Sequence, residues 1–384
     1  MKPLSQSVLS IPPSGIRRFF DLVAEMDDVI SLGVGEPDFV TPWRIREAAI
    51  YSLEKGRTTY TSNYGLLELR TEIARKTRER IGVGYDPAHE VLVTVGVSEA
   101  LDVAFRAMLN PGDEVLVPEP CYVSYMACVQ FAGGCPVAVP TRADTGFRVT
   151  ADDIRSRVTP RTKAILLSYP NNPTGATMDA AGLQAIVDIA VEFDLYLVAD
   201  EIYDRLSYDD PHTSVASLNG ARERTVLLNG FSKAYAMTGW RIGYACAPAP
   251  ILDLMLKIHS YTMLCAPITA QIGAIEALRH GDRDADEMVA DYDRRRRLFV
   301  KGLNDIGLDC PMPGGAFYAF PSIASTGLDE EEFTERLLSE QHVLVVPGTA
   351  FGPGGKGHVR CCYATATDQL QEALRRMAVF LGTL

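Results

Sequence analysis

The sequence lacks any apolar stretch long enough to cross a membrane. No run of apolar residues reaches the roughly 18 that a membrane-spanning helix requires. The opening segment, MKPLSQSVLSIPPSGIRRFF, also lacks the continuous apolar stretch of a secretory signal peptide. We therefore expect a soluble, cytoplasmic protein that has no membrane partner.

The spacings of metal sites and disulfide scaffolds are missing as well. The eight cysteines are scattered without a CxxC pair, and the six histidines show neither HExxH nor HxH spacing. Cys361 and Cys362 are adjacent, and neighbouring residues of a strand point to opposite faces, so we do not expect these two cysteines to bond each other or to share a metal. We expect reduced thiols, as in a cytosolic protein, and no bound metal.

The chain has fewer positive than negative side chains: 37 are Lys or Arg and 49 are Asp or Glu, which gives a net charge of −12. Such a chain repels a phosphate backbone, so we expect no nucleic-acid partner. One basic run, Arg294 to Arg297, follows a series of acidic residues: Asp282, Asp284, Asp286, Glu287, Asp291 and Asp293. This pattern predicts a solvent-exposed helix face with its own ion pairs.

The composition itself is that of a globular protein, 47% hydrophobic and 22% charged, over 384 residues. This length predicts two or three domains. From about residue 45, apolar strand patterns alternate with helical patterns of about a dozen residues. The strands are expected at 91–96, 114–119, 136–140, 163–169, 195–201, 225–230 and 244–247, and the main helices at 43–56, 66–81, 98–109, 179–193 and 249–259. The alternation predicts βαβ units and a mostly parallel, buried sheet.

The last hundred residues show a different mixture. A long polar helix is expected to leave the sheet domain, and strand and helix patterns follow it. The helices are expected at 283–306, 329–341 and 367–382, and the strands at 316–320, 343–348 and 358–364. This mixture predicts a smaller α+β domain.

Polar residues gather at the carboxyl ends of the expected strands, where open α/β sheets bind their ligands. The residues at these ends are Gly96, Val97, Ser98, Tyr122, Asn171, Asn172, Asp200, Tyr203, Ser232 and Lys233, with Arg241 further along the last loop. This rim combines a lysine, an aspartate, an arginine and a helix N-terminus. It has no nucleophile–His–Asp set.

Common nucleotide motifs do not account for this rim. The sequence has no GxxxxGK[ST], and its literal GxGxxG, Gly352 to Gly357, contains Pro353 and leads into a strand, so we expect a loop there. An aromatic aldehyde with a phosphate does fit. A lysine can form a Schiff base with the aldehyde, a carboxylate can keep a pyridine nitrogen protonated, and a helix N-terminus with Ser and Arg can hold the phosphate. That combination is the chemistry of pyridoxal phosphate.

Longer segments of the sequence resemble the class I/II, fold-type I aminotransferases, and most closely their prokaryotic aspartate/aromatic branch. These segments are GEPDF (35–39), YTSNYGLLELR (60–70), NPTG (172–175), ADEIY (199–203), SKAYAMTGWRIGY (232–244), PGGAFYAF (313–320), VLVVPGTAFG (343–352) and VRCCYAT (359–365). The resemblance implies a pyridoxal 5′-phosphate-dependent enzyme with a large, doubly wound α/β domain at 45–283. A small domain would combine 1–44 with 284–384, and two chains would form a homodimer with shared active sites.

The resemblance also implies a role for each residue of the rim. Lys233 would form the Schiff base and act as general base, while Asp200 would pair with the pyridine nitrogen. Tyr203 and Asn172 would hydrogen-bond the phenolic oxygen of the ring, and Tyr122 would stack on the ring.

The phosphate contacts implied by the resemblance come from two chains. Arg241, Ser232 and the backbone N–H groups of Val97 and Ser98 would hold the phosphate in one chain. Tyr60 would reach the phosphate in the partner subunit.

Substrate contacts are implied for three residues: Arg360 would bind the α-carboxylate through its fork, Gly35 would contact it through its backbone, and Asn172 would join them. No clear second arginine is present for a side-chain carboxylate, which puts a strict aspartate aminotransferase in doubt. Arg17 and Arg18 are candidates for that role, and solvent-exposed helix charges are the alternative.

One residue departs from the family pattern. Gly230 stands in the triplet before Phe231-Ser232-Lys233, where the family often has a serine. This removes one possible phosphate ligand and leaves more of the phosphate binding to Ser98, Ser232 and Arg241.

The expected reaction moves an amino group from an L-amino acid to a 2-oxo acid, for which we expect 2-oxoglutarate, with ping-pong kinetics. The alternative is a C–S β-lyase, or a cyclopropane-forming synthase, on the same fold, because the same carbanion can eliminate, cyclise or be reprotonated. A ligand-sensing domain of a transcription regulator would carry an added DNA-binding domain, for which about 40 residues before the large domain are too few. Aspartate, aromatic, alanine, methionine and N-acetyl-diaminopimelate-type donors stay open.

Overall fold

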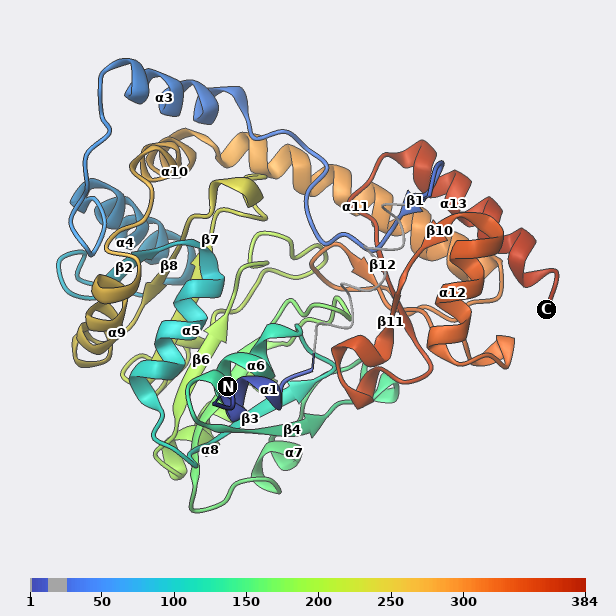
Figure 1. Ribbon diagram of the computed structural model, residues 1–384, viewed down its shortest axis with the longest axis horizontal. Helices are drawn as coiled ribbons and strands as arrows, with labels where there is room; N and C mark the ends of the chain where they lie inside the picture. The colour runs from blue at the N-terminus through green and yellow to red at the C-terminus, as the bar shows by residue number, and fades with distance from the viewer. Residues whose placement is uncertain (1, 13–25) are drawn as a thin grey trace.

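The computed structural model of the protein describes residues 2–12 and 26–384. Within these residues a seven-stranded sheet has the order β2-β8-β7-β6-β5-β3-β4 (Figure 1). The strands are β2 (Val91–Thr94), β3 (Glu114–Glu119), β4 (Cys135–Pro140), β5 (Thr162–Ser168), β6 (Tyr196–Asp200), β7 (Thr225–Gly230) and β8 (Gly243–Cys246). Strand β8 runs antiparallel to both of its neighbours, and the other neighbouring pairs are parallel. The predicted, mostly parallel α/β sheet is therefore confirmed.

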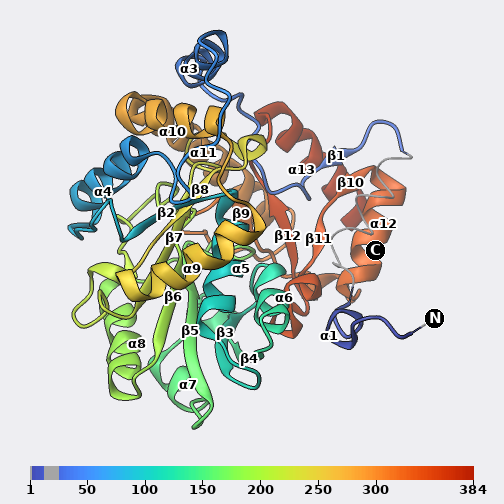
Figure 2. The same ribbon diagram turned by 60° about the vertical axis from the view of Figure 1, so that its left-hand side comes forward.

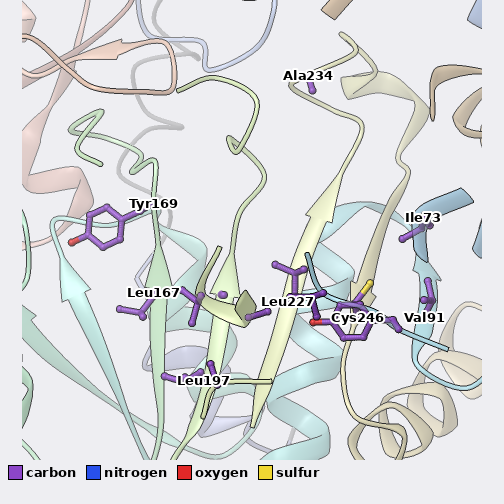
Figure 3. Close-up of a cluster of buried hydrophobic side chains, with 14 of the residues drawn as sticks. Ile73, Val91, Leu167, Tyr169, Leu197, Leu227, Ala234 and Cys246 are labelled. Atoms are coloured by element: carbon purple, nitrogen blue, oxygen red, sulfur yellow. The ribbon is translucent and has the colours of Figure 1, made fainter. Parts of the chain in front are cut away.

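The sheet is buried on both faces because helices cover each of them. Alternate residues of β5 pack into different apolar clusters, Ile165 and Leu167 into one and Ala164 and Leu166 into the other. Figure 3 shows part of the first cluster, where Leu167 and other side chains project from neighbouring strands. Helices α4 (Leu67–Ile81), α8 (Ala180–Glu192) and α10 (Ile268–His280) join the first cluster, and α5 (Gly96–Met108), α6 (Ser124–Phe131) and α9 (Ala249–Thr262) join the second.

A second group of elements has an apolar core of its own. A three-stranded antiparallel sheet has the order β11-β12-β9, and β1 pairs in parallel with β10. These elements are β1 (Ile30–Ser31), β9 (Tyr318–Ala319), β10 (Val343–Leu344), β11 (Val346–Pro347), β12 (Val359–Cys362), α12 (Glu330–Gln341) and α13 (Thr367–Leu381). The long helix α11 (Asp282–Asp305) runs from α10 to this group (Figures 1 and 2).

The remaining elements are short or peripheral. Helix α3 (Trp43–Glu54) lies at the edge of the molecule and packs against α10 (Figure 1). The others are α1 (Gln6–Leu9), α7 (Ala151–Arg155) and 3-10 turns at Ala143–Thr145, Val215–Ser217, Thr238–Trp240, Ala324–Thr326, Gly348–Phe351 and Pro353–Gly355. The GxGxxG segment forms turns that lead into β12, which confirms the predicted loop. No helix in the described part of the chain is both long and apolar enough to cross a membrane.

Several elements differ from the sequence prediction. The expected strand at 343–348 is two short strands, β10 and β11, because the chain changes its pairing partner from β1 to β12. Helix α10 was not predicted because small and apolar residues are buried around most of its circumference, which leaves no clear apolar stripe. Strand β1 has two residues, too few to give an alternating pattern. The strand expected at 316–320 shrinks to Tyr318–Ala319.

The basic run on α11 is not the solvent-exposed face that the sequence predicted. Arg294 and Arg297 are exposed, but Arg295 and Arg296 are buried. Aromatic rings cover both guanidinium groups: Arg295 lies against Phe39 and Tyr292, and Arg296 lies against Tyr208. Arg296 pairs with Asp209, 2.7 Å away. The prediction of ion pairs is confirmed and the prediction of full exposure is wrong.

Candidate active site

A cavity of about 380 Å³ opens at the carboxyl ends of the central strands. It is lined by eleven of the candidate residues: Gly35, Val97, Ser98, Tyr122, Asn172, Asp200, Tyr203, Ser232, Lys233, Arg241 and Arg360. Residues from the second group of elements, among them Tyr318, close one side of it. The fold therefore brings together residues that lie as far apart in sequence as Gly35 and Arg360.

Lys233 lies in the turn that follows β7. Its Nζ donates a hydrogen bond to the carbonyl of Gly35, 2.7 Å away. Burial lowers the pKa of Lys233 to about 8, and the positive charges of Arg360 and Arg241 act in the same direction. A sizeable fraction of this amine is therefore neutral near physiological pH.

Asp200 ends β6 and points into the same cavity. Its Oδ1 accepts from the backbone N–H of Ile202 at 3.2 Å, and its Oδ2 lies 2.8 Å from the hydroxyl of Tyr125. Burial raises the pKa of Asp200 to about 6, and the hydrogen bond from Tyr125 opposes that rise. Asp200 forms no ion pair with any of residues 2–12 and 26–384, although the positive charge of Lys233 acts to lower its pKa.

Tyr125 was not predicted as a site residue. Its hydroxyl also lies 2.7 Å from Oγ of Ser168. A phenol has one proton, so when Asp200 is ionised Tyr125 donates to the carboxylate and Ser168 supplies the proton of the second bond. One signal in the sequence could have found it, because Tyr125 follows the candidate Tyr122 by three residues, and the two rings pack edge to face at 5.6 Å.

The start of α5 forms a corner suited to an anion. Gly96 has φ +76°, and a Cβ built on it would lie 2.5 Å from Nη2 of Arg241. A Cβ on Gly243 would lie 2.7 Å from the backbone N of Val97. The missing side chains let a guanidinium approach free N–H groups at a helix N-terminus, an arrangement that favours negative charge.

The packing of β7 against β8 explains why a glycine stands at position 230. A Cβ built on Gly230 would lie 3.0 Å from Cα of Gly243 and 3.1 Å from the carbonyl of Ile242. A serine there would require the adjacent strand β8 to shift. The serines that do line the cavity are Ser98 and Ser232.

Arg360 comes from β12, on the other side of the cavity. Its Nη1 donates to Oδ1 of Asn172 at 2.9 Å, and its Nη2 donates to the carbonyl of Gly33. The guanidinium lies between the rings of Tyr318 and Phe351, 4.6 and 4.8 Å from their centres. Its Nε is buried and has no hydrogen-bond partner among the described residues.

Two tyrosines close the wall beside the lysine. The hydroxyls of Tyr203 and Tyr318 lie 2.7 Å apart, and burial raises the pKa of Tyr203 well above its ordinary value. Tyr318 lies inside the predicted PGGAFYAF segment but was not assigned a role there. Glu36 and Thr238, which also line the cavity, were likewise missed.

One candidate residue is not brought to the cavity in this chain, and two others cannot be placed. Tyr60 is 82% exposed in this single chain, on the loop before α4. Arg17 and Arg18 lie outside the described residues.

Comparison with known proteins agrees with this geometry. The model of the family described as aminotransferase class I and II matches residues 27–377. The chain belongs to the class I and II aminotransferases. It is 56% identical to the Bacillus subtilis protein YugH, with 98% of each chain covered. It is 47% identical to an aspartate aminotransferase of Pyrococcus abyssi, with 96% of this chain and 95% of the relative covered.

A solved structure supports this assignment. The crystal structure of an aromatic aminotransferase from Pyrococcus horikoshii OT3 superposes on this aminotransferase with a TM-score of 0.91 at 45% identity, and covers 95% of this chain and 99% of that chain. The protein is thus a fold-type I enzyme that transfers amino groups. The lyase alternative is not favoured.

Proposed function

We propose that this aminotransferase binds pyridoxal 5′-phosphate in the cavity, because its polar groups fit the parts of that molecule. The corner at Gly96 and Arg241 offers N–H groups and a guanidinium to the phosphate. Asp200 is buried and lacks a cationic partner in the described chain, and a protonated ring nitrogen would supply one. Lys233 presents an amine for the aldehyde carbon.

The other cavity residues complete this proposed cofactor site. Ser232, Ser98 and the backbone N–H of Val97 would add hydrogen bonds to the phosphate. Tyr122 would stack on the ring, and Tyr203 would hydrogen-bond the phenolic oxygen together with Asn172. Their common position on the lining of one cavity supports these assignments.

The proposed general base is Lys233. When bound, the cofactor supplies an electron sink for the carbanion that forms at the substrate Cα. Lys233 takes the Cα proton and passes it on, for which its amine must be neutral. With a pKa of about 8, roughly a tenth of the amine is neutral at pH 7. At the ordinary lysine pKa that fraction would be below about 0.1%.

The proposed carboxylate site is the fork of Arg360. The rings of Tyr318 and Phe351 hold the guanidinium on both sides, so little freedom is lost when it binds. The buried Nε without a partner is a free donor for a carboxylate. Asn172 and the backbone of Gly35 line the same wall. A bidentate pair here would orient the Cα–H bond of the substrate.

We propose an L-amino acid as donor and 2-oxoglutarate as acceptor, in a ping-pong cycle. Two of the proteins compared above are named for aspartate and for aromatic amino acids, so we propose that the donor belongs to one of these two classes. Among the described residues, the arginines that line the cavity are Arg241 and Arg360, and both already have a proposed role, which supports the aromatic class.

We further propose that two chains form a homodimer that completes each site. Large apolar side chains are exposed on α3, before and at the start of α4, on α9 and directly after α9: Trp43, Tyr51, Leu53, Tyr60, Leu67, Leu254, Tyr261 and Met263. These elements lie on the left-hand side in Figure 1, the side that comes forward in Figure 2. So large an apolar surface favours a second protein surface over water.

We also propose that the chain divides into a large domain at 45–283 and a small domain made of 1–44 and 284–384. Their separate apolar cores support this division. A cytoplasmic location is proposed because none of the eight cysteines is paired in a disulfide.

The observation that carries the proposed function is the placement of Lys233, Asp200 and Arg360 on one cavity. The test records the visible absorption of the purified holoenzyme while single L-amino acids are added without an oxo acid. We expect the band of the lysine-bound cofactor to disappear with release of one equivalent of 2-oxo acid. A Lys233→Ala variant should fold and turn over at less than about a hundredth of the wild-type rate. A band that survives every amino acid, or continuous release of pyruvate and ammonia, would contradict the proposal.

A further inference from the structure

Residues 33–41, which we call the strap, form an irregular segment whose first four residues line the cavity. On the side of the sheet it is tied to the loop after β7. Nζ of Lys233 donates to the carbonyl of Gly35 at 2.7 Å, and Oγ1 of Thr238 donates to Glu36 at 3.2 Å. The strap therefore lies directly over the proposed base.

On the opposite side the strap is tied to Arg360 and to α11. The carbonyl of Gly33 accepts a hydrogen bond from Nη2 of Arg360. Nη1 of Arg295 lies 2.9 and 2.8 Å from the two carboxylate oxygens of Asp38. Gly33 and Asp38, which make these contacts, lie on either side of Gly35 in the sequence. The strap is therefore held both before and after Gly35.

The pair between Arg295 and Asp38 is well shielded from water. The side chain of Arg295 is 9% exposed and that of Asp38 is 28% exposed. The guanidinium also lies against the rings of Phe39 and Tyr292, at 5.1 and 5.6 Å. An ion pair in such surroundings is screened far less than exposed pairs are, so its loss has a larger effect.

The chain between Asp38 and Gly35 transmits this restraint. Pro37 lies between them, and its ring fixes one backbone angle of the short link. A Cβ built on Gly35 would lie 2.4 Å from the hydroxyl of Tyr318, so the backbone of Gly35 rests directly on that side chain. A shift of Asp38 therefore moves the Gly35 backbone, whose carbonyl accepts the hydrogen bond from Lys233.

We propose that Arg295 is a positioning residue for the substrate α-carboxylate. Through Asp38 it holds the strap so that the Gly33 carbonyl orients Arg360 and the Gly35 backbone faces the carboxylate. This inference rests on the proposed function, in which Arg360 and Gly35 bind that group. Loss of the pair weakens substrate binding and leaves the cofactor contacts at the Gly96 corner in place.

The test compares Arg295→Gln, Asp38→Asn, the double variant and Arg295→Lys in the holoenzyme, with Arg294→Gln as control. Arg294 sits beside Arg295 on α11 but its side chain is 70% exposed. We expect KM for the amino acid to rise about tenfold in each Gln or Asn variant, with kcat changed less than about threefold. Nη2 of Arg295 also pairs with Asp291 at 2.6 Å, so Asp38→Asn is the change that removes the pair with Asp38 alone. The double variant should resemble Arg295→Gln, because Asp38 has already lost its partner there. Arg295→Lys should restore part of the loss, and the control should stay within about twofold of wild type.

Hydrogen exchange of the cofactor-free protein gives a second measurement that does not depend on activity. Amides of residues 33–41 should exchange faster in Arg295→Gln and Asp38→Asn than in wild type or Arg294→Gln. Unchanged KM together with unchanged exchange in the folded variants would overturn the inference. So would effects of the two single changes that simply add in the double variant. If wild type transfers no amino group, the proposed function fails instead, and the exchange measurement still decides whether Arg295 holds the strap.

Discussion

At the scale of single residues, burial acts in opposite directions on the two central charges of the site. It disfavours the charged form of each group, so it lowers the pKa of Lys233 to about 8 and raises that of Asp200 to about 6. The lowered value suits a base that must be neutral. The raised value works against a carboxylate that must stay ionised, and Tyr125 partly offsets it with its hydrogen bond.

The first prediction concerns Tyr125→Phe. Asp200 is ionised above its pKa of about 6, so cofactor affinity should fall as pH decreases through this value. Removal of the Tyr125 hydroxyl raises that pKa, and the pH at which affinity is half lost should move upward by about one unit. Titration of cofactor binding between pH 5 and pH 8 measures the shift.

The control for this prediction is Tyr169→Phe. It also removes a buried hydroxyl, but one that bonds the backbone of Val149. The same shift in both variants, or no shift in Tyr125→Phe, would show that Tyr125 does not act through Asp200.

At the scale of elements, the second prediction concerns the start of α5. Gly96→Ala places a methyl group 2.5 Å from Nη2 of Arg241, at a backbone angle of φ +76°. We expect cofactor affinity to fall more than about tenfold, because the guanidinium must leave the helix N-terminus. Equilibrium dialysis or absorption titration measures it.

A matched control separates backbone strain from this contact. Gly82 has φ +73°, and the methyl group of an alanine there would meet no atom within 4 Å. Gly82→Ala should lower the free energy of unfolding by about 1 kcal/mol through backbone strain, and Gly96→Ala should lose a similar amount for the same reason. Gly82→Ala should leave cofactor affinity unchanged. Equal affinities in the two variants would refute the anion corner.

The third prediction belongs to α11 and its arginines. Arg296 is fully buried and binds Asp209 and the carbonyl of Pro313, each at 2.7 Å. Arg296→Ala should lower the free energy of unfolding by about 1–3 kcal/mol, since it leaves the buried carbonyl of Pro313 without its donor, whereas the exposed Asp209 keeps its contact with Arg297. Arg297→Ala, on the same helix but exposed, should cost less than about 1 kcal/mol. Urea unfolding followed by circular dichroism compares them, and similar losses would contradict the role of burial.

At the scale of the whole molecule, the fourth prediction tests the proposed homodimer. Trp43→Asp with Tyr261→Asp places charges on the exposed apolar surface and should give monomers in sedimentation experiments. These monomers should bind the cofactor at least about tenfold more weakly, because Tyr60 of the partner subunit is then absent. Val379→Asp, an exposed apolar position on α13, is the control. A wild-type monomer, or a variant monomer with unchanged affinity, would overturn the proposal.

Sequence prediction worked best for the strands of the large sheet. The strands of the large sheet are continuous apolar runs, and β3, β6 and β7 were predicted within a residue or so of their ends. Polar residues after these strands were expected to meet, because parallel strands end at the same edge of a sheet. Pairings such as β1 with β10 join segments about 300 residues apart, and no local pattern indicates them.

The sequence by itself determined the α/β class, the family resemblance and the candidate residues at the strand ends, because these depend on local periodicity and on motifs. Tertiary structure alone decided the burial of Arg295 and Arg296, the contact of Tyr125 with Asp200 and the course of residues 33–41 over Lys233. Burial and pKa depend on which distant segments pack around a side chain. That packing is a property of the whole fold, and the spacing of neighbouring residues in the sequence does not indicate it.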